Sequence, residues 1–297
     1  MVGSETYIEK FKEHLIDRRQ ASVNTVASYA RDIAQFLRFC EKDGLADIVE
    51  GDVRGYLSSL SEKGLKPATT ARVTASLKAF FGYLAGDSII ASNPTEGITT
   101  SGFSRELPQV LTDKEIALLF AKPNLYTLKG LRDKAMLETL YATGIRVSEL
   151  VALDESDVNL AMNLITCRGS RERTIPLYKD AVAVLSEYIA SARPQMIASE
   201  QESALFVNKD GERMTRQGFW KLVKTYTEKA EITKDITPQT LRHSFAAHLL
   251  ENGADIKVLQ EMLGHTNIAS TQVYAKVVKR QLKDEYFRSH PRSRPNR

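Results

Sequence analysis

A break in the first half of the chain constrains the fold most, because it separates two segments with different hydrophobic patterns. Ser92-Asn93-Pro94 interrupts the helical periodicity before it, and the stretch from Thr99 to Pro108 is rich in Ser, Thr and Gly. Such a stretch between periodic segments is typical of a linker. With 297 residues, the chain is long enough for two domains that each bury a core. We therefore expect an N-terminal domain at 1–98, a linker at 99–110 and a second domain at 111–297.

The segment before the break predicts a small helical domain. Apolar side chains recur there at helical spacing in two sets: Tyr29, Ile33, Phe36, Leu37 and Cys40, then Leu77, Phe80, Phe81 and Leu84. Ser22 or Asn24 is suited to cap the first helix, and Gly64-Leu65-Lys66-Pro67 separates the two sets. We expect the aromatic residues to form a core, with base stacking as the minor alternative.

Basic residues lie on the polar faces of these predicted helices. They are Arg31, Arg38, Lys66, Arg72 and Lys78. Side chains of this kind meet either nucleic-acid phosphates or only water, and their spacing leaves both possibilities open.

The second domain has a mixed pattern. Thr112 and Glu115 have the spacing of a capping box, and an apolar-periodic helix runs from Leu128 to Tyr141 until Thr143-Gly144 interrupts it. Two strands, 163–167 and 173–177, flank a tight turn at 169–170, and 204–207 is a candidate third strand. The fold class is therefore mainly α, with a helical first domain and an α+β second domain that carries a small antiparallel sheet.

Composition narrows the location and the class of protein. Cys40 and Cys167 are too few for a disulfide framework or a metal cluster, so we expect two unpaired thiols in a reducing cytoplasm. The longest apolar runs are far shorter than a membrane span, and the N-terminus lacks a hydrophobic signal core. We therefore expect a cytoplasmic protein with no membrane partner.

The net charge of +4 is modest, but basic residues concentrate near the C-terminus. From Lys276 onward, only Asp284 and Glu285 oppose these cations: Lys279, Arg280, Lys283, Arg288, Arg292, Arg294 and Arg297. A tail of this kind is either a solvated segment or one that acts near DNA or a partner subunit.

Four side chains in the second domain suggest chemistry on a phosphate. Arg146 and Arg242 each carry a planar guanidinium that grips two phosphate oxygens at once. Tyr274 is a candidate nucleophile, and His265 is a candidate hydrogen-bond donor or proton carrier. Clustered positive charge would favour the Tyr274 phenolate during attack, since a free tyrosine has a pKa of about 10.

These residues stand in motifs that resemble those of the tyrosine recombinases, specifically the short Xer-type members. The segments are Thr143-Gly144-Ile145-Arg146-Val147-Ser148-Glu149-Leu150, Thr240-Leu241-Arg242-His243-Ser244-Phe245, Leu263-Gly264-His265, Ser270-Thr271-Gln272-Val273-Tyr274 and the ending Tyr286-Phe287-Arg288-Ser289-His290-Pro291-Arg292. The resemblance covers almost the whole chain. It implies a SAM-like core-DNA-binding domain followed by a tyrosine-recombinase catalytic domain, the two closing around DNA as a clamp.

The resemblance also implies an activity. Tyr274 would attack a DNA phosphate to form a 3′-phosphotyrosyl link, which a 5′ hydroxyl of a partner duplex then attacks, with no metal or other cofactor. Arg146 and Arg242 would clamp the phosphate, with Glu149 orienting Arg146, while His265 completes the pocket. The biological role implied is chromosome dimer resolution during cell division.

The implied partners are a double-stranded DNA recombination site and related recombinase subunits. Such enzymes act as homo- or hetero-tetramers, with the C-terminal tail docking on a neighbour, and Leu282, Tyr286 and Phe287 suit that docking. A division-site DNA translocase is a further expected partner.

Two positions depart from the family pattern. Where the family has a lysine in the sheet hairpin that is thought to protonate the leaving 5′ oxygen, this chain has Arg168, with Arg171 and Arg173 as alternatives. Arginine stabilises charge but is a poor acid. Where the family usually has histidine, Gln239 donates a hydrogen bond but carries no proton. We expect Arg168 and Gln239 to occupy the pocket of an active but slow enzyme.

Two other histidines are expected to lie outside the active site. His243 follows Arg242 directly and so points about 100° away around the helix, which favours packing or hydrogen bonding, and His248 is interpreted in the same way. Two alternative functions remain open: a DNA-binding partner that no longer cuts, and a mobile-element integrase with the same chemistry.

Overall fold

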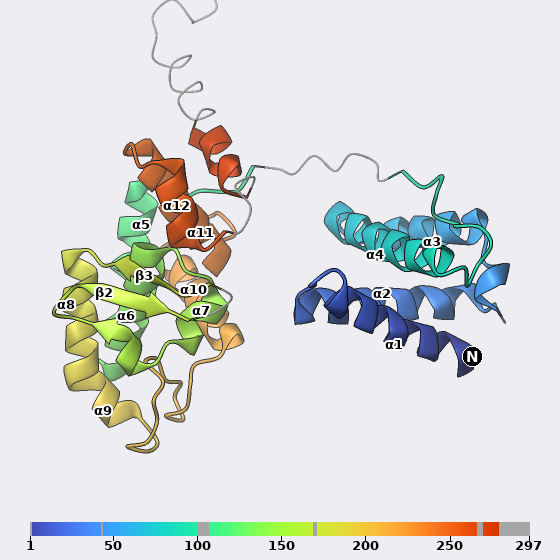
Figure 1. Cartoon of the computed structure of the whole chain (residues 1–297). Coiled ribbons are helices and arrows are strands. Elements are labelled where there is room, and N and C mark those ends of the chain that lie inside the picture. Colours follow the sequence, from blue (N-terminus) through green and yellow to red (C-terminus); the bar gives the residue numbers. More distant parts are fainter. Residues whose placement is uncertain (1, 43, 100–106, 169–170, 266–269, 279–297) are drawn as a thin grey trace, which may run out of the picture. The chain divides into compact units, whose positions relative to one another are not determined.

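The computed structural model describes residues 2–42, 44–99, 107–168, 171–265 and 270–278. The chain divides into two compact units, 1–105 and 106–297 (Figure 1). Each unit has its own hydrophobic core.

Unit 1 is helical, as its periodicity predicts. Its elements are α1 (Val2–Asp17), α2 (Val23–Cys40), the 3-10 turn η1 (Leu45–Asp47), α3 (Glu50–Glu62) and α4 (Pro67–Gly86). Of the two predicted caps, Ser22 is the one used, and its hydroxyl accepts a hydrogen bond from the Thr25 backbone N–H. Pro67 stands at the first position of α4, where its missing N–H costs no helical hydrogen bond.

The core of unit 1 consists of the aromatic residues that the sequence places at helical spacing. Phe36 of α2 and Phe80 and Phe81 of α4 are fully buried, and their rings meet edge to face. Helix α2 packs against α1, α3 and α4. Base stacking by these three phenylalanines is thereby excluded, because their rings have no exposed surface.

Unit 2 surrounds one long helix. Its helices are α5 (Asp113–Phe120), α6 (Leu128–Thr143), α7 (Val147–Ala152), α8 (Lys179–Glu187), α9 (Arg193–Met196), α10 (Arg216–Lys229), α11 (Pro238–Glu251) and α12 (Ile256–Leu263), with a 3-10 turn η2 (Glu155–Asp157), a π-helical turn η3 (Tyr188–Ala192) and a further helical segment at 270–278. The predicted capping box of Thr112 and Glu115 begins α5.

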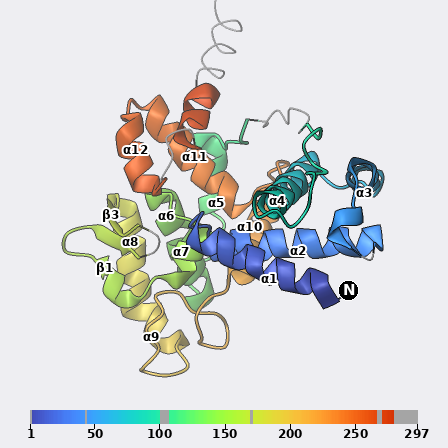
Figure 2. The same ribbon diagram turned by 45° about the vertical axis from the view of Figure 1, so that its right-hand side comes forward.

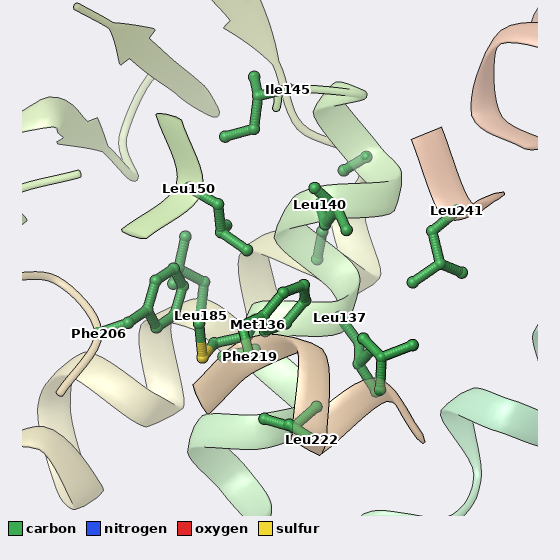
Figure 3. Close-up of a cluster of buried hydrophobic side chains, with 14 of the residues drawn as sticks. Met136, Leu137, Leu140, Ile145, Leu150, Leu185, Phe206, Phe219, Leu222 and Leu241 are labelled. Atoms are coloured by element: carbon green, nitrogen blue, oxygen red, sulfur yellow. The ribbon is translucent and has the colours of Figure 1, made fainter. Parts of the chain in front are cut away.

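Helix α6 is buried along most of its length and contacts α5, α7, α8, α9 and α11. Figure 3 shows side chains from α6, α7, α8, α10 and α11 converging in this core, among them Met136, Leu140 and Phe219. Because α6 is central, packing on all of these helices fixes where its C-terminal end lies, and α7 begins four residues after that end. This end carries the first residues of the candidate site.

A three-stranded antiparallel sheet lies in unit 2 in the order β1-β2-β3, formed by β1 (Val158–Asn159), β2 (Leu164–Cys167) and β3 (Arg173–Pro176). The register pairs Ile165 with both Val158 and Ile175. The predicted hairpin is confirmed, but its turn at 169–170 lies outside the described residues.

The predicted third strand at 204–207 is wrong. This segment forms only isolated bridges, Asp154 with Ala204 and Val207 with Arg213, and the third strand is β1. Residues 204–207 are fully buried, and a short apolar run has the same pattern in a strand as in a buried loop. In the part of the chain that the structure describes, no helix combines the length and the apolar character needed to cross a membrane.

Candidate active site

Arg146 stands where α6 ends and α7 begins. Gly144 ends α6 with a left-handed φ of 60°, and a Cβ there would lie 2.2 Å from the Phe245 ring, so only glycine fits this turn. Arg146 caps α7, and its backbone N–H donates to Glu149 Oε2 at 2.7 Å. The Arg146 side chain is 43% exposed, with only long contacts to Glu149 Oε1 (3.4 Å) and the Gly264 carbonyl (3.5 Å). The guanidinium is therefore open to a ligand.

Arg242 projects from the second turn of α11 and is buried. Its guanidinium donates to the Gly144 carbonyl, to the Leu263 carbonyl at 2.8 Å and to His265 Nε2 at 2.9 Å. It thus joins the end of α6, the end of α12 and the candidate histidine. Burial, reinforced by the charge of Arg146, lowers the pKa of Arg242 to about 10, so the side chain stays charged at neutral pH.

His265 is positioned by the end of α12. Gly264 ends the helix with a left-handed φ of 62°, and the backbone N–H of His265 donates to the Gln260 carbonyl at 3.1 Å. His265 Nε2 must accept from Arg242, since a guanidinium has only donors. Nδ1 then carries the proton and donates it to Thr271 Oγ1 at 2.9 Å. Both ring nitrogens are therefore engaged before any substrate binds.

Tyr274 lies in the helical segment at 270–278 and is 3% exposed. Its hydroxyl is 2.9 Å from His243 Nδ1. The His265 ring lies nearly parallel to the Tyr274 ring, with 6.5 Å between ring centroids and 13° between planes. The candidate nucleophile thus has a histidine near its hydroxyl and another beside its ring.

The ionisation of these three rings follows from burial and from the arginines. Burial raises the pKa of the Tyr274 hydroxyl, whereas the charges of Arg242 and Arg146 act to lower it without outweighing burial. The arginines therefore act in the expected direction, but the phenol keeps its proton at neutral pH. Burial and the charge of Arg242 lower the pKa of His243 and of His265 to about 4, so both imidazoles are neutral.

An ion pair that sequence reasoning did not identify supports the site. Arg173 of β3 donates from Nη1 and Nη2 to the two carboxylate oxygens of Glu149, at 2.9 and 3.1 Å, and from Nε to the Met262 carbonyl at 2.6 Å. The pair links the sheet, α7 and the end of α12. Arg173 is therefore committed to a structural pair, which argues against it as a substitute for the family's hairpin lysine.

The other hairpin arginines differ from Arg173. The Arg168 guanidinium lies 2.7 Å from Asp157 Oδ1, and its side chain is 61% exposed. Arg171 is exposed. Gln239 lies in the first turn of α11 and is also exposed. Within the described part of the chain, neither Arg168 nor Gln239 makes an ion pair or hydrogen bond with the cluster, and their predicted roles stay predictions.

The expectation that His243 lies outside the site is wrong, because its ring nitrogen contacts the candidate nucleophile. Helical geometry gives only the direction of His243 around α11, and the helical segment at 270–278 brings Tyr274 to this side chain. The only signal in the sequence is its position next to Arg242. His248 lies elsewhere, hydrogen-bonded to Tyr141 Oη and to the Leu111 carbonyl.

Three other expectations concern metals, thiols and the tail. Across the described ranges, no three His, Cys, Asp or Glu side chains gather in a way that would hold a metal ion. Cys40 and Cys167 are free thiols, as expected, and burial raises the pKa of Cys167 to about 12. Leu282, Tyr286 and Phe287 lie outside the described residues.

Two protein families match this chain. Residues 109–281 match the Phage integrase family, and residues 8–86 match the Phage integrase N-terminal SAM-like domain. The helical first unit and the α+β second unit agree with this assignment. The chain belongs to the phage integrase family, and it is a tyrosine site-specific recombinase.

Relatives place it among the Xer-type members, which confirms the resemblance found in the sequence. The tyrosine recombinase XerD of Oceanobacillus iheyensis is 46% identical, over 97% of this chain and 99% of that protein. XerD of Listeria monocytogenes serotype 4b is 42% identical, over 96% and 99%.

Solved structures agree with the fold. A crystal structure of XerA recombinase is 27% identical with a TM-score of 0.55, over 97% of this chain and 99% of that one. The structure of XerH bound to a palindromic difH substrate has a TM-score of 0.74 and covers 94% of this chain and 84% of that one. Because only 21% of the residues are identical, this similarity supports the fold alone.

Proposed function

We propose that Tyr274 is the nucleophile that cuts and rejoins DNA. Its hydroxyl oxygen attacks the scissile phosphorus, the bond to the 5′ oxygen breaks, and a 3′-phosphotyrosyl link forms. The 5′ hydroxyl of a partner duplex then attacks this link and releases Tyr274. The observation that supports this proposal most strongly is the single cluster in which a buried tyrosine hydroxyl lies among two arginines and two neutral histidines.

Arg146 and Arg242 are proposed to hold the phosphate in two different ways. Arg242 is fixed by two backbone carbonyls, so it is preorganised and loses little entropy when an anion binds. Arg146 is exposed and loosely paired, so it is free to turn toward the anion. Their mutual repulsion, which helps to lower the pKa of Arg242, is relieved when a phosphate lies between them.

The cluster suits a reaction that needs no external energy source. Cutting exchanges one phosphate ester bond for another, and rejoining reverses the exchange. The residues in the cluster supply charge, hydrogen bonds and a nucleophile. Gln239 and Arg168 are proposed to contact the DNA phosphates near the cut, since both side chains are exposed and both carry N–H donors.

The biological role that we propose is chromosome dimer resolution in the cytoplasm. The similarity to proteins named XerD over nearly their full length supports this role. The proposed assembly is a tetramer on two DNA sites, with a related recombinase in the heteromeric case and a division-site DNA translocase as activator. Deleting the residues after 281 should weaken assembly on paired sites more than binding to one site, and an equal loss of both would contradict the docking role of the tail.

A DNA-binding partner that does not cut is the second candidate function. The observation that favours it is the ion pair between Arg168 and Asp157, since the position of the family's hairpin lysine is taken by an arginine that is already paired. Such a subunit would bind its site as tightly as an active one.

Covalent trapping on a nicked suicide substrate that carries the native recombination site distinguishes the cutting recombinase from the non-cutting partner. The natural protein should form a protein–DNA adduct, and Tyr274→Phe should form none while binding the same DNA. Tight binding without an adduct over a range of pH would reject the proposed activity and favour the non-cutting partner.

A further inference from the structure

A proton must leave Tyr274 before or as its oxygen bonds to phosphorus. Tyr274 is 3% exposed, and burial raises the pKa of its hydroxyl, so the group keeps its proton at neutral pH and bulk water has little access to it. We propose that His243 is a catalytic residue that accepts the Tyr274 proton during DNA cleavage. This inference rests on the proposed function, because it concerns the same nucleophile.

The inference rests on the contact between His243 and Tyr274. His243 Nδ1 is 2.9 Å from Tyr274 Oη, which is the distance of a made hydrogen bond, and the two ring planes are tilted by 50° with 5.5 Å between centroids. A general base must lie within hydrogen-bond reach of the proton that it removes. His243 satisfies this requirement before any substrate binds.

The other groups near the hydroxyl are unsuited to accept a proton. Arg146 and Arg242 are cations whose charge acts on Tyr274, and a charged guanidinium has no free lone pair. His265 uses Nε2 to accept from Arg242 and Nδ1 to donate to Thr271. His243 is therefore the only neutral base with a direct hydrogen bond to the hydroxyl among the described residues.

The substitution at Gln239 gives this role added weight. Glutamine cannot carry a proton, so the position three residues before Arg242 contributes no base in this chain. His243 lies on the same helix, one residue after Arg242, and its pKa is lowered by burial and by the Arg242 charge. A bound phosphate anion would offset that positive charge and make protonation of His243 easier, so the base would strengthen when the substrate arrives.

Cleavage moves one proton to His243 and exchanges one phosphate ester bond for another. The Tyr274 O–H proton passes to His243 Nδ1, the bond between Oη and phosphorus forms, and the bond between phosphorus and the 5′ oxygen breaks. The departing 5′ oxygen takes a proton from water, which leaves hydroxide, and so becomes a hydroxyl. In the rejoining step His243 returns its proton to Tyr274 as the phosphotyrosyl bond breaks, and hydroxide takes the proton of the attacking 5′ hydroxyl, which restores water.

His243→Asn tests the role of the proton in the full-length protein. Asparagine places an amide atom near the position of Nδ1 and keeps a hydrogen bond to the phenol, but it does not accept a proton. The matched control is His248→Asn, because His248 on the same helix makes a similar bond from Nδ1 to Tyr141 Oη, at 2.7 Å. Single-turnover adduct formation is measured on the suicide substrate, together with DNA binding and thermal unfolding.

We expect His243→Asn to form the adduct roughly 100-fold more slowly than the natural protein, as loss of a general base does. DNA affinity should be unchanged, and His248→Asn should keep the natural rate. A rate for His243→Asn within about tenfold of the natural rate would overturn the inference. If the natural protein itself forms no adduct, the proposed function fails instead.

A second substrate separates removal of the tyrosine proton from protonation of the leaving group. A 5′-bridging phosphorothiolate has a sulfur leaving group that departs without a proton. His243→Asn should remain equally slow on it, since the missing step lies at Tyr274. Restoration of the natural rate on this substrate would place the defect at the leaving group and overturn the inference.

A measurement on unaltered His243 keeps the inference testable if His243→Asn is unstable. The ¹⁵N NMR resonances of the histidine rings are compared between the natural protein and Tyr274→Phe, which removes the hydroxyl alone. The Nδ1 resonance of His243 should shift and that of His248 should stay. An unchanged His243 resonance would show that the hydrogen bond does not exist in solution and would overturn the inference.

Discussion

Replacing Glu149 by glutamine should destabilise unit 2 by about 3 kcal/mol. Glu149 and Arg173 are 10% and 9% exposed, and the two charges face each other through two hydrogen bonds. Removing one charge leaves the largely buried guanidinium of Arg173 without its charged partner, and breaking a buried pair costs roughly 3–5 kcal/mol. We take the lower end because glutamine keeps the shape and one acceptor oxygen.

The effect should depend on pH in a defined direction. Burial by itself would raise the pKa of Glu149, but the hydrogen bonds from the Arg173 side chain and the Arg146 backbone lower the pKa below its usual value. A carboxylate of this kind stabilises the fold above its unfolded pKa of about 4.3, and the contribution is lost as the pH falls through the lower folded pKa. The difference between natural protein and Glu149→Gln should therefore be complete at neutral pH and shrink below about pH 4.

Urea unfolding followed by tryptophan fluorescence measures this difference. Trp220 is the single tryptophan of the chain and lies in α10, so its signal reports on unit 2. Asp210→Asn is the control, because the Lys209–Asp210 pair is 88% and 60% exposed and should contribute less than about 1 kcal/mol. A loss below about 1 kcal/mol for Glu149→Gln at pH 7 would refute the reasoning, since the pair would then behave as an exposed one.

Three further outcomes are expected. Arg168→Lys restores a group that releases a proton, so the adduct should form faster on the suicide substrate; an unchanged rate would show that proton delivery there is not limiting. Gly144→Ala places a Cβ against Phe245 in a left-handed turn and should lower the free energy of unfolding by at least about 1 kcal/mol, measured by Trp220 fluorescence. An unfolding midpoint equal to that of the natural protein would contradict this expectation. Phe81→Ala should lower the free energy of unfolding of unit 1 by about 3–5 kcal/mol, measured by circular dichroism, because Phe81 is fully buried. A loss below about 1 kcal/mol would contradict its position in the core.

Local chemistry in the sequence predicted most helices and the hairpin. The Thr112–Glu115 capping box forms with both of its hydrogen bonds, because its partners are three residues apart and need no tertiary contact. Gly144 ends α6 for the same kind of reason. The error at 204–207 has a physical cause: the segment is buried on all sides, so its apolar run does not distinguish a strand from a packed loop.

The sequence by itself also determined the family, and its ordered motifs name four candidate side chains, Arg146, Arg242, His265 and Tyr274. In the structure, contacts and charges connect these four through segments far apart in the chain. The order of the motifs along the chain names these candidates without their coordinates, and their roles in the reaction remain the proposal made above.

Only the tertiary structure decided which neighbours act on them. The contact between His243 and Tyr274 joins two helices, and the pair of Glu149 and Arg173 joins a helix to a strand. Periodicity gives the direction of a side chain around its own helix, but it does not say which element packs on that side. Burial likewise arises only when the elements assemble, and it keeps the Tyr274 proton in place and both histidines neutral.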